Sequence, residues 1–434
     1  MDEALRQTGT TLDAFTGRYA ARTAGMTASE IRALFAVASR PEVVSLAGGM
    51  PFTSALPLEQ VGKLMSDLMG ARGAAALQYG SGQGDPALRE LICEVMSLEG
   101  VQASPDDVVV TVGSQQALDL VTRIFCDPGD VVLAEAPSYV GALGTFAAYQ
   151  AEVVHVAMDE HGLVPEALRE AVARVGSRAK FLYTIPNFHN PAGTSLSDAR
   201  RTEVLEICRA AGLLVLEDNP YGLLGFDGPP VPAIRARGGE DDVVYLGSFS
   251  KTFAPGLRVG WVLAPHAVRE KLVLAAEASV LCPPALNQMV VVDYLVNHDW
   301  RHQVEVFKDI YRERRDAMLD ELERQMPPGT TWTHPAGGFY VWTTLPEGLD
   351  SKVMQPRAIT ARVAYVPGIG FYADGQGRRD LRLSYCFPEP ERIREGVRRL
   401  GGVVAEELEL LSTFGPVTQL ARPHGADTPA PDML

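Results

Sequence analysis

The stretch that decides the fold reads Ser248-Phe249-Ser250-Lys251-Thr252-Phe253-Ala254-Pro255-Gly256-Leu257-Arg258-Val259-Gly260-Trp261. Apolar runs flank its polar centre, from Val243 to Leu246 and from Val259 to Leu263. Such runs are typical of buried strands, so Lys251 is predicted to lie on the turn between two of them. An amine at that place is unusual and needs a chemical explanation.

Lysine attacks a carbonyl only as the neutral amine, and a partly dry site beside other cations lowers its pKa toward that form. Arg258 is such a cation, and its planar guanidinium can also bind a phosphate through two parallel hydrogen bonds. Ser248 and Ser250 add two hydroxyl donors. An amine that can form a Schiff base beside phosphate donors points to pyridoxal phosphate. The alternative is a surface turn in which Lys251 and Arg258 are merely solvated.

The same stretch resembles the cofactor-lysine segment of the fold-type I pyridoxal-phosphate aminotransferases, in the subgroup with 2-aminoadipate and kynurenine aminotransferases. Lys251 and Arg258 are one residue closer together than in the aspartate aminotransferase signature, which favours that subgroup. The resemblance extends from about Ser29 to about Leu400. It implies an α/β fold, with a mainly parallel seven-stranded sheet covered by helices in a large domain and a smaller α+β domain.

The composition excludes several other classes of protein. The chain has 434 residues, of which 46% are hydrophobic and 21% charged, as in an ordinary globular protein. Acidic residues outnumber basic ones by 54 to 39, and no basic block suggests a nucleic-acid partner. No apolar run has membrane-spanning length, and the N-terminus shows no export signal, so we expect no membrane association and a cytoplasmic location.

The metal-binding and disulfide-forming residue types show no useful pattern. The five cysteines are odd in number and widely spaced, so neither a disulfide framework nor a structural zinc site is predicted. The eight histidines have no metal-ligand spacing, and we predict no metal.

Apolar runs and helical patterns alternate through the middle of the chain. Strands are predicted at 108–112, 131–134, 152–156, 181–185, 213–216, 243–246 and 259–263, with helical patterns between several of them, for example at 166–174 and 198–210. Buried strands that alternate with helices favour a mainly parallel sheet covered on both faces. In such sheets ligands bind at the carboxyl ends of the strands.

Candidate cofactor residues follow several of these strands. Ser114 and Gln115 open a predicted helix, whose N-terminus is a natural seat for a phosphate, although Ser114 could also simply cap the helix. Tyr139 follows the strand at 131–134; packing is the usual role for such an aromatic, but the resemblance implies stacking on the pyridine ring. Asn190 matches the family asparagine before a proline, and the resemblance implies contact with the cofactor's ring oxygen and with the substrate.

Asp218 is the most important candidate after Lys251. A carboxylate against the pyridine nitrogen keeps that nitrogen protonated, so the ring can withdraw electrons from the substrate's α-carbon. A capping or turn role is the alternative. Tyr221 matches the family tyrosine that hydrogen-bonds the ring oxygen. His189 is not assigned as a base, because a lone histidine in a turn is usually structural and the lysine already transfers protons.

Three candidates lie in the N-terminal part of the chain. Arg32 is near the start of a predicted helix; it could be solvated, but the resemblance implies contact with the distal carboxylate of acidic substrates. Gly49 lies in a Gly-Gly segment that the resemblance places beneath the substrate carboxylate. Tyr79 precedes a Gly-rich loop, and the resemblance implies that it reaches the cofactor phosphate of the neighbouring subunit in a homodimer.

Arg382 lies inside an apolar strand near the C-terminus, where an unpaired charge is costly, so it needs an anion. A substrate α-carboxylate is the natural partner, and an internal salt bridge is the alternative. We expect an N-terminal arm at 1–55 that joins the small domain, a large cofactor-binding domain at 56–312, a small domain at 313–411, and a disordered tail at 412–434.

The sequence thus predicts a homodimeric pyridoxal-phosphate aminotransferase. Its expected substrates are an aromatic, long-chain or aminoadipate-like amino acid and a 2-oxo acid such as 2-oxoglutarate. A lyase or decarboxylase on the same scaffold is the alternative, because it would use the same cofactor residues. An aminotransferase-like transcription regulator is a further alternative, but such regulators carry a DNA-binding domain before this fold, and too few residues precede residue 45 for one.

Overall fold

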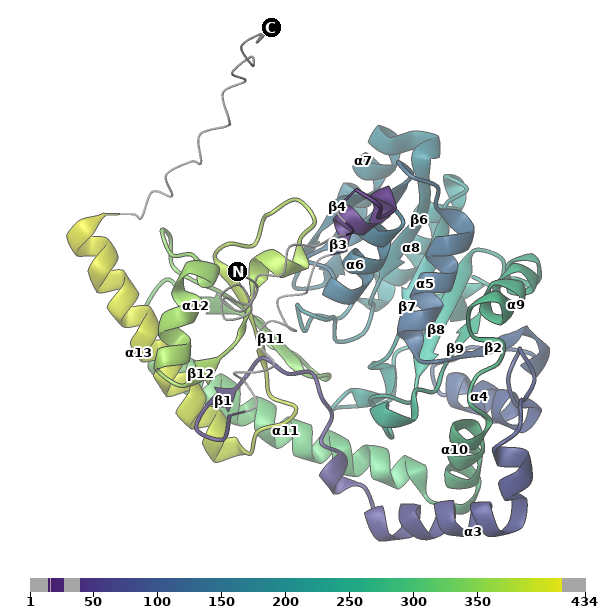
Figure 1. The fold of residues 1–434 in the computed structure, drawn as a ribbon. Helices are drawn as coiled ribbons and strands as arrows, with labels where there is room; N and C mark the ends of the chain where they lie inside the picture. Colours follow the sequence, from purple (N-terminus) through teal and green to yellow (C-terminus); the bar gives the residue numbers. More distant parts are fainter. Residues whose placement is uncertain (1–14, 16, 27–39, 416–434) are drawn as a thin grey trace, which may run out of the picture.

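The computed structural model describes residues 15, 17–26 and 40–415. They form two parts around two separate main sheets, joined by a long helix that crosses between them (Figure 1). The helices of more than eight residues are α3 (Leu58–Ala76), α4 (Pro86–Ser97), α5 (Ser114–Phe125), α6 (Val140–Ala148), α7 (Pro165–Val175), α8 (Asp198–Ala210), α9 (His266–Val280), α10 (Ala285–Asn297), α11 (Trp300–Gln325), α12 (Ser351–Thr360) and α13 (Pro390–Phe414).

The large sheet confirms the predicted alternation of strands and helices. Its strands, in spatial order, are β2 (Val108–Thr111), β9 (Gly260–Leu263), β8 (Val243–Ser248), β7 (Leu214–Asp218), β6 (Ala179–Thr184), β3 (Val131–Ala136), β4 (Glu152–Asp159) and β5 (Gly162–Leu163). Neighbouring strands from β8 to β4 are parallel, whereas β9 is antiparallel to both of its neighbours. The sheet has eight strands rather than seven, because the chain turns back after β4 and adds the two-residue β5 at the edge.

Helices cover both faces of this sheet, as the continuous apolar runs predicted. On β3, Val131 and Leu133 belong to a core shared with α7 and α8, whereas Val132 and Ala134 belong to a core shared with α5 and α6. Alternate residues therefore point to opposite buried faces. Full burial of each such valine or leucine contributes about 1.5–3 kcal/mol.

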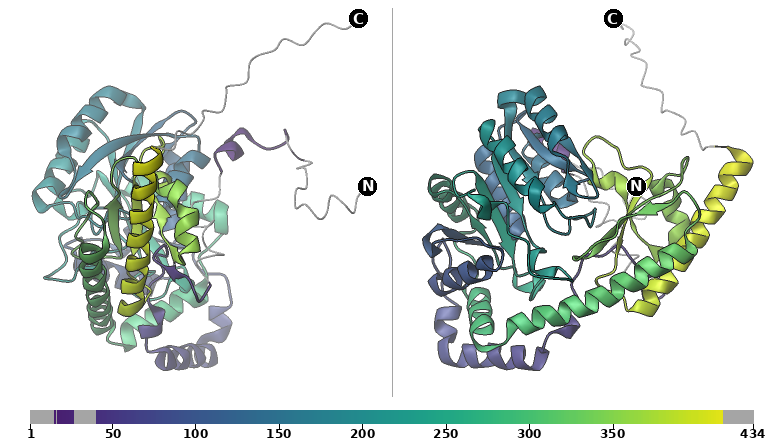
Figure 2. Two further views of the ribbon diagram at one scale, coloured as in Figure 1. Left: turned by 90° about the vertical axis from the view of Figure 1, so that its left-hand side faces the viewer. Right: turned by 180° about the vertical axis from the view of Figure 1, so that it is seen from behind.

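The smaller part is built on a four-stranded sheet of β10 (Thr331–Trp332), β11 (Tyr340–Thr344), β14 (Asp380–Ser384) and β13 (Val366–Pro367), in that order. All of its pairings are antiparallel. The helices α12 and α13 accompany it, and α11 runs from the large part to pack along α13 (Figure 2). The predicted small α+β unit is therefore present.

The chain before residue 56 contacts both parts. The short β1 (Val44–Ser45) pairs in parallel with β12 (Val363–Ala364), and beyond it the N–H of Ser384 donates to the Leu46 carbonyl at 2.8 Å. The 3-10 turn η1 (Ala21–Gly25) instead packs on α6 of the large part, which differs from the arrangement expected for the arm.

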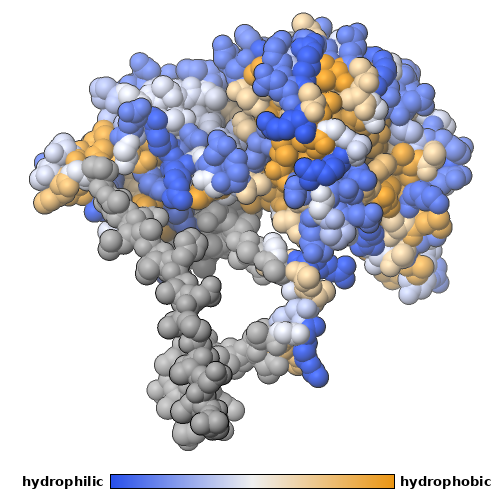
Figure 3. All heavy atoms as spheres, turned by 90° about the horizontal axis from the view of Figure 1, so that it is seen from above, coloured by the Kyte–Doolittle hydropathy of each residue, from blue (hydrophilic) through white to orange (hydrophobic). Residues whose placement is uncertain are grey.

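The C-terminal boundary also differs from expectation. Helix α13 continues through Phe414, so residues 412–414, expected in a disordered tail, are helical. No helix among the described residues has both the length and the apolar character needed to cross a membrane. Seen from above, hydrophilic residues are interspersed with hydrophobic ones over the described surface (Figure 3).

A buried polar network supports the loops that follow β6 and β7. The carboxyl of Glu99, just after α4, accepts hydrogen bonds from Asn219 Nδ2 at 2.6 Å and from the Tyr245 hydroxyl at 3.0 Å. Asn187 joins it, because its Nδ2 donates to Asn219 Oδ1 at 2.9 Å. Burial raises the pKa of Glu99 to about 7. The network ties the residue after Asp218 to the loop that contains Asn190.

We predict that Glu99→Gln makes the stability of the folded protein less sensitive to rising pH. The Glu99 carboxyl ionises near pH 4.5 when exposed and near 7 when buried, so its contribution to stability is full below about 4.5 and declines as the pH rises toward 7. Glutamine carries no charge, and its Oε1 can still accept from Asn219, whereas its Nε2 would donate to the Tyr245 hydroxyl and so reverse that bond. As the pH rises, the free energy of unfolding of the variant should therefore fall by about 1–3 kcal/mol less than that of the unmodified protein.

The control for this experiment is Glu94→Gln, an exposed residue of α4. It should leave the pH dependence unchanged. Equal slopes for Glu99→Gln and the unmodified protein would show that Glu99 does not retain its proton in the folded state.

Candidate active site

A cavity of about 820 Å³ lies between the two parts of the molecule. Its walls come from the carboxyl ends of β3, β6, β7 and β8, from the start of α5, from residues 40–52, and from the β11 and β14 strands of the small sheet. The cavity lining includes most of the candidates from the sequence: Gly49, Ser114, Gln115, Tyr139, Asn190, Asp218, Tyr221, Ser248, Ser250, Lys251, Arg258 and Arg382.

Lys251 lies on the connection between β8 and β9, as predicted. Its Nζ atom is partly buried and donates a hydrogen bond to the Gly49 carbonyl at 3.0 Å. The pKa of the Lys251 amine is lowered to about 8, mainly by burial; Cys386 acts in the opposite direction, and the guanidinium groups of Arg382 and Arg258 contribute to the lowering. The amine is therefore closer to its neutral, nucleophilic form than an exposed lysine.

Asp218 is the last residue of β7 and is only 3% exposed. Its Oδ2 atom accepts a hydrogen bond from the Tyr183 hydroxyl at 2.8 Å, whereas Oδ1 has no partner among the described residues. The pKa of Asp218 is raised to about 6 by burial, although the hydrogen bond from Tyr183 and the electrostatic influence of His189 act in the opposite direction. The alternative of a capping role is not supported, because its hydrogen-bonding partner is a side chain of another strand.

The serines and Arg258 gather beside the start of α5. Ser248 Oγ lies 2.8 Å from Ser250 Oγ and accepts the backbone N–H of Ser250 at 3.0 Å. Arg258 has φ +53° and donates to the Val112 carbonyl at 3.2 Å. Its guanidinium passes over Gly113, where an added Cβ atom would lie 2.4 Å from Arg258 Nη2, so only glycine allows this approach.

Helix α5 presents its N-terminus to the same corner. Ser114 is its first residue and Gly113 its N-cap, with no side-chain capping bond, so the simple capping role considered for Ser114 was wrong. The side chain of Gln115 contacts α6 and its N-cap residue: its Nε2 donates to Thr145 Oγ1 at 2.9 Å, and its Oε1 lies 3.4 Å from the Tyr139 hydroxyl. The corner combines backbone donors, hydroxyls and a guanidinium, which is the chemistry that binds a phosphate.

Arg382 lies at the small-domain side of the cavity and is 1% exposed. Nη1 donates to Asn190 Oδ1 at 2.8 Å, Nη2 donates to the Ala47 carbonyl at 2.7 Å, and Nε has no partner among the described residues. Neither acceptor is charged, so the internal salt bridge considered as an alternative is not found there. Tyr340 packs against the guanidinium, with its ring centre 4.2 Å from the central carbon.

Sequence reasoning missed several residues of the site. Tyr340, from β11, lies between two candidates: its hydroxyl is 3.5 Å from the Tyr221 hydroxyl and would be 2.2 Å from a Cβ atom added to Gly49. Cys386 Sγ donates to the Met50 carbonyl at 3.1 Å and so fixes the segment that contains Gly49. The only signal for Tyr340 in the sequence was its membership in an apolar strand.

His189 is fully buried, and its Nδ1 accepts the backbone N–H of Ala192 at 3.2 Å. Its Nε2 lies 3.0 Å from the buried carboxylate of Glu135, which also accepts from Thr184 and the backbone of Ile185. Nε2 makes no hydrogen bond among the described residues, and the neighbours of both ring nitrogens lie outside the cavity lining.

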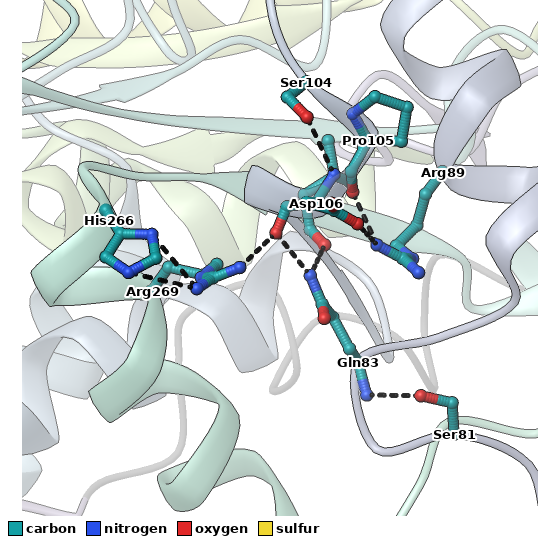
Figure 4. A network of polar contacts seen from close by, with 9 residues as sticks. Ser81, Gln83, Arg89, Ser104, Pro105, Asp106, His266 and Arg269 are labelled. Carbon is teal, nitrogen blue, oxygen red and sulfur yellow. Dashed lines mark hydrogen bonds and ion pairs between the residues drawn. The ribbon is translucent and has the colours of Figure 1, made fainter.

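One described candidate is not brought to the cavity. Tyr79 is 77% exposed and is absent from the lining, although the loop that follows it is well anchored. As Figure 4 shows, Gln83 Nε2 donates to the Asp106 carbonyl at 2.7 Å, and Arg269 Nη1 donates to the same oxygen at 2.6 Å. Arg32 lies outside the described residues.

Comparison with known proteins agrees with this geometry. The family model for class I and II aminotransferases matches residues 41–400. The chain is 40% identical to aromatic-amino-acid aminotransferase 1 of Thermococcus litoralis over 390 residues, which cover 89% of this chain and 93% of that protein. It is 39% identical to the 2-aminoadipate transaminase of Thermus thermophilus over 387 residues, which cover 88% of this chain and 96% of that protein.

A solved structure shows the same likeness. The alpha-aminoadipate aminotransferase of Thermus thermophilus, complexed with N-(5'-phosphopyridoxyl)-L-leucine, superposes with a TM-score of 0.85 at 38% identity, covering 92% of this chain and 100% of that one. The fold and the comparisons define a fold-type I pyridoxal-phosphate enzyme. Within that class, the chain belongs to the class I and II aminotransferases and is an amino-group transferase that depends on pyridoxal 5'-phosphate.

The residues in the cavity fit this cofactor. The unpartnered, buried Oδ1 of Asp218 could accept a hydrogen bond from a protonated ring nitrogen. Ser248, Ser250 and Arg258 would supply phosphate donors beside the start of α5, and Lys251 would supply the amine.

We predict that Gly49→Ala disrupts the site because the new methyl group collides with the Tyr340 hydroxyl. The overpacking should cost about 1–3 kcal/mol in the free energy of unfolding. Gly49→Ala with Tyr340→Phe should recover most of this loss, because the next ring atom is 3.3 Å from the added Cβ.

Gly48→Ala is the control, since its added methyl group would have its nearest neighbour at 4.0 Å. The free energies of unfolding of the unmodified protein and these three variants are measured by denaturant titration. A double variant no more stable than Gly49→Ala alone would contradict the proposed collision.

Proposed function

We propose that this enzyme moves the amino group of an aromatic, long-chain or aminoadipate-like amino acid to a 2-oxo acid, with 2-oxoglutarate as the expected acceptor. The observation that carries the proposal is the arrangement in one cavity of a lysine with a lowered pKa, a buried carboxylate with a free oxygen, and a buried arginine with no charged partner. The named activities of the two relatives support the choice of substrates.

Lys251 is the proposed catalytic residue. When bound, the cofactor supplies a reactive aldehyde carbon and a ring that withdraws electrons from the substrate's α-carbon. Lys251 Nζ is the atom that we propose to be joined covalently to it in the resting enzyme. As a free amine, Nζ would be the base that takes the proton from the substrate's α-carbon, because its lowered pKa makes it an effective base near neutral pH.

Four residues are proposed to hold the cofactor ring. Asp218 Oδ1 would accept a hydrogen bond from the protonated ring nitrogen. Tyr221 and Asn190 would donate to the ring oxygen, and Tyr139 would pack against the ring. The geometry supports this assignment because all four residues line the same cavity as Lys251.

The proposed phosphate site combines Ser114, Gln115, Ser248, Ser250 and Arg258. We also propose that the enzyme is a homodimer in which Tyr79 of the partner subunit completes this site. The high exposure of Tyr79 on an anchored loop supports this proposal, since its side chain is available to another chain. The cytoplasmic location stays a prediction from the sequence.

The substrate is proposed to bind on the small-domain side. Arg382 pairs with the α-carboxylate, and Gly49 leaves room for it beside Tyr340. Asn190 holds the guanidinium in position through its Oδ1. The expectation that Arg32 meets the distal carboxylate of acidic substrates also stays a prediction.

We predict that Lys251→Ala abolishes multiple-turnover transamination but leaves noncovalent cofactor binding to the phosphate site. The variant should release the cofactor on gel filtration in denaturant, whereas the unmodified protein after borohydride reduction should retain it on the chain, as read by mass spectrometry. Lys271→Ala, an exposed lysine on α9, is the matched control. Sustained turnover by Lys251→Ala would contradict the assignment of Lys251 as the catalytic residue.

We predict that Arg382→Gln lowers kcat/KM for amino acids by about 30-fold or more, because it leaves the α-carboxylate without its buried partner. A primary amine with the same side chain but no carboxylate serves as the comparison substrate. The slow reaction of this amine should have nearly the same rate in the variant as in the unmodified enzyme. An equal loss with both substrates would mean that Arg382 supports the fold rather than the carboxylate.

A further inference from the structure

The two carboxylate oxygens of Asp218 have different surroundings. Oδ2 is occupied by the Tyr183 hydroxyl at 2.8 Å, in a fully buried contact. Oδ1 is equally buried and has no partner among the described residues. One oxygen is therefore held by the protein, and the other is left for a ligand.

The position of the Tyr183 hydroxyl is fixed by the large sheet. Tyr183 lies on β6 in register with Leu216 on β7, two residues before Asp218. Its ring is 0% exposed and packs edge-on against Phe146 of α6, with ring centres 5.5 Å apart. The hydroxyl cannot follow a rotating carboxylate, so it selects one orientation of Asp218.

We propose that Tyr183 is a positioning residue for the cofactor: its hydroxyl orients Asp218 so that Oδ1 faces the ring nitrogen, and it keeps the carboxylate ionised to hold that nitrogen's proton. This inference rests on the proposed role of Asp218. Tyr183 itself is absent from the cavity lining, so it acts through Asp218 and not on the substrate.

The electrostatic surroundings of Asp218 make this donor important. Burial favours the neutral carboxyl and raises its pKa, and the groups that face it are Tyr183 from β6, His189 from the loop after β6, and Tyr139 at the start of α6. Of the residues that the structure describes, only Tyr183 hydrogen-bonds the carboxylate, and this bond favours the ionised form. Without it both oxygens would be buried without a donor, and the carboxyl would hold its own proton.

The test compares two ligands on apoenzyme variants. One ligand is pyridoxal 5'-phosphate, and the other is its analogue with C–H in place of the ring nitrogen, which cannot donate to Asp218. For Tyr183→Phe we expect the affinity for pyridoxal phosphate to fall about tenfold relative to the affinity for the analogue, since a hydrogen bond to a charged group is weakened. Equilibrium dialysis measures both affinities.

The control variant is Tyr245→Phe, which removes an equally buried hydroxyl on β8 that donates to Glu99. It should change both affinities by the same factor, as any purely structural loss would. Asp218→Asn is the reference and should abolish the preference for the ring nitrogen.

The possible outcomes distinguish a failure of the proposed role of Tyr183 from a failure of the proposed role of Asp218. If Asp218→Asn abolishes the preference and Tyr183→Phe weakens both ligands equally, Tyr183 is only structural and the inference is overturned. If Asp218→Asn leaves the preference intact, the proposed role of Asp218 fails as well. A preference lost in Tyr183→Phe and kept in Tyr245→Phe supports the inference.

Discussion

The structure depends on charged groups that are buried without charged partners. Within the described part of the chain, Arg382 hydrogen-bonds only a side-chain amide and a backbone carbonyl, and Asp218 only a tyrosine hydroxyl. Burying such groups is costly, and the cost is tolerated here because each retains an unpaired atom in or beside one cavity. A bound ligand with an anionic end and a protonated ring would satisfy both groups, so the apoprotein holds unfavourable electrostatics that binding relieves.

The cavity exists because two sheets with different topologies meet at one edge. The parallel strands of the large sheet bring Tyr139, Asn190, Asp218 and Lys251 to the same side, since their carboxyl ends align. The antiparallel small sheet supplies Arg382 and Tyr340 from neighbouring strands. Residues 44–50 close the gap between the two, because they pair with β12, accept from Arg382 and contact Lys251.

The sequence was sufficient for the framework and for the residues at the strand ends. The runs at 131–134 and 243–246 are buried on both faces, so their apolar character was continuous and easy to interpret. Tyr183 and Glu99 could not be found in this way, because their roles arise from contacts across the fold. Tyr183 looked like one more apolar strand residue, and Glu99 lies in a stretch without any motif. The expectation that Ser114 could cap α5 was wrong, because Gly113, with φ +76°, is the N-cap residue and no side chain caps the helix.

The contact between Arg382 and the Ala47 carbonyl joins residues 335 positions apart in the chain. During synthesis on the ribosome, the segment around residue 47 emerges early, whereas β12 and Arg382, which hold it from the small-domain side, are made only near the end of the polypeptide. The large sheet can assemble first from local strand and helix units, but the substrate side of the cavity must form last. A nascent or prematurely terminated chain of this protein would therefore carry the lysine without the arginine, and could not catalyse the reaction.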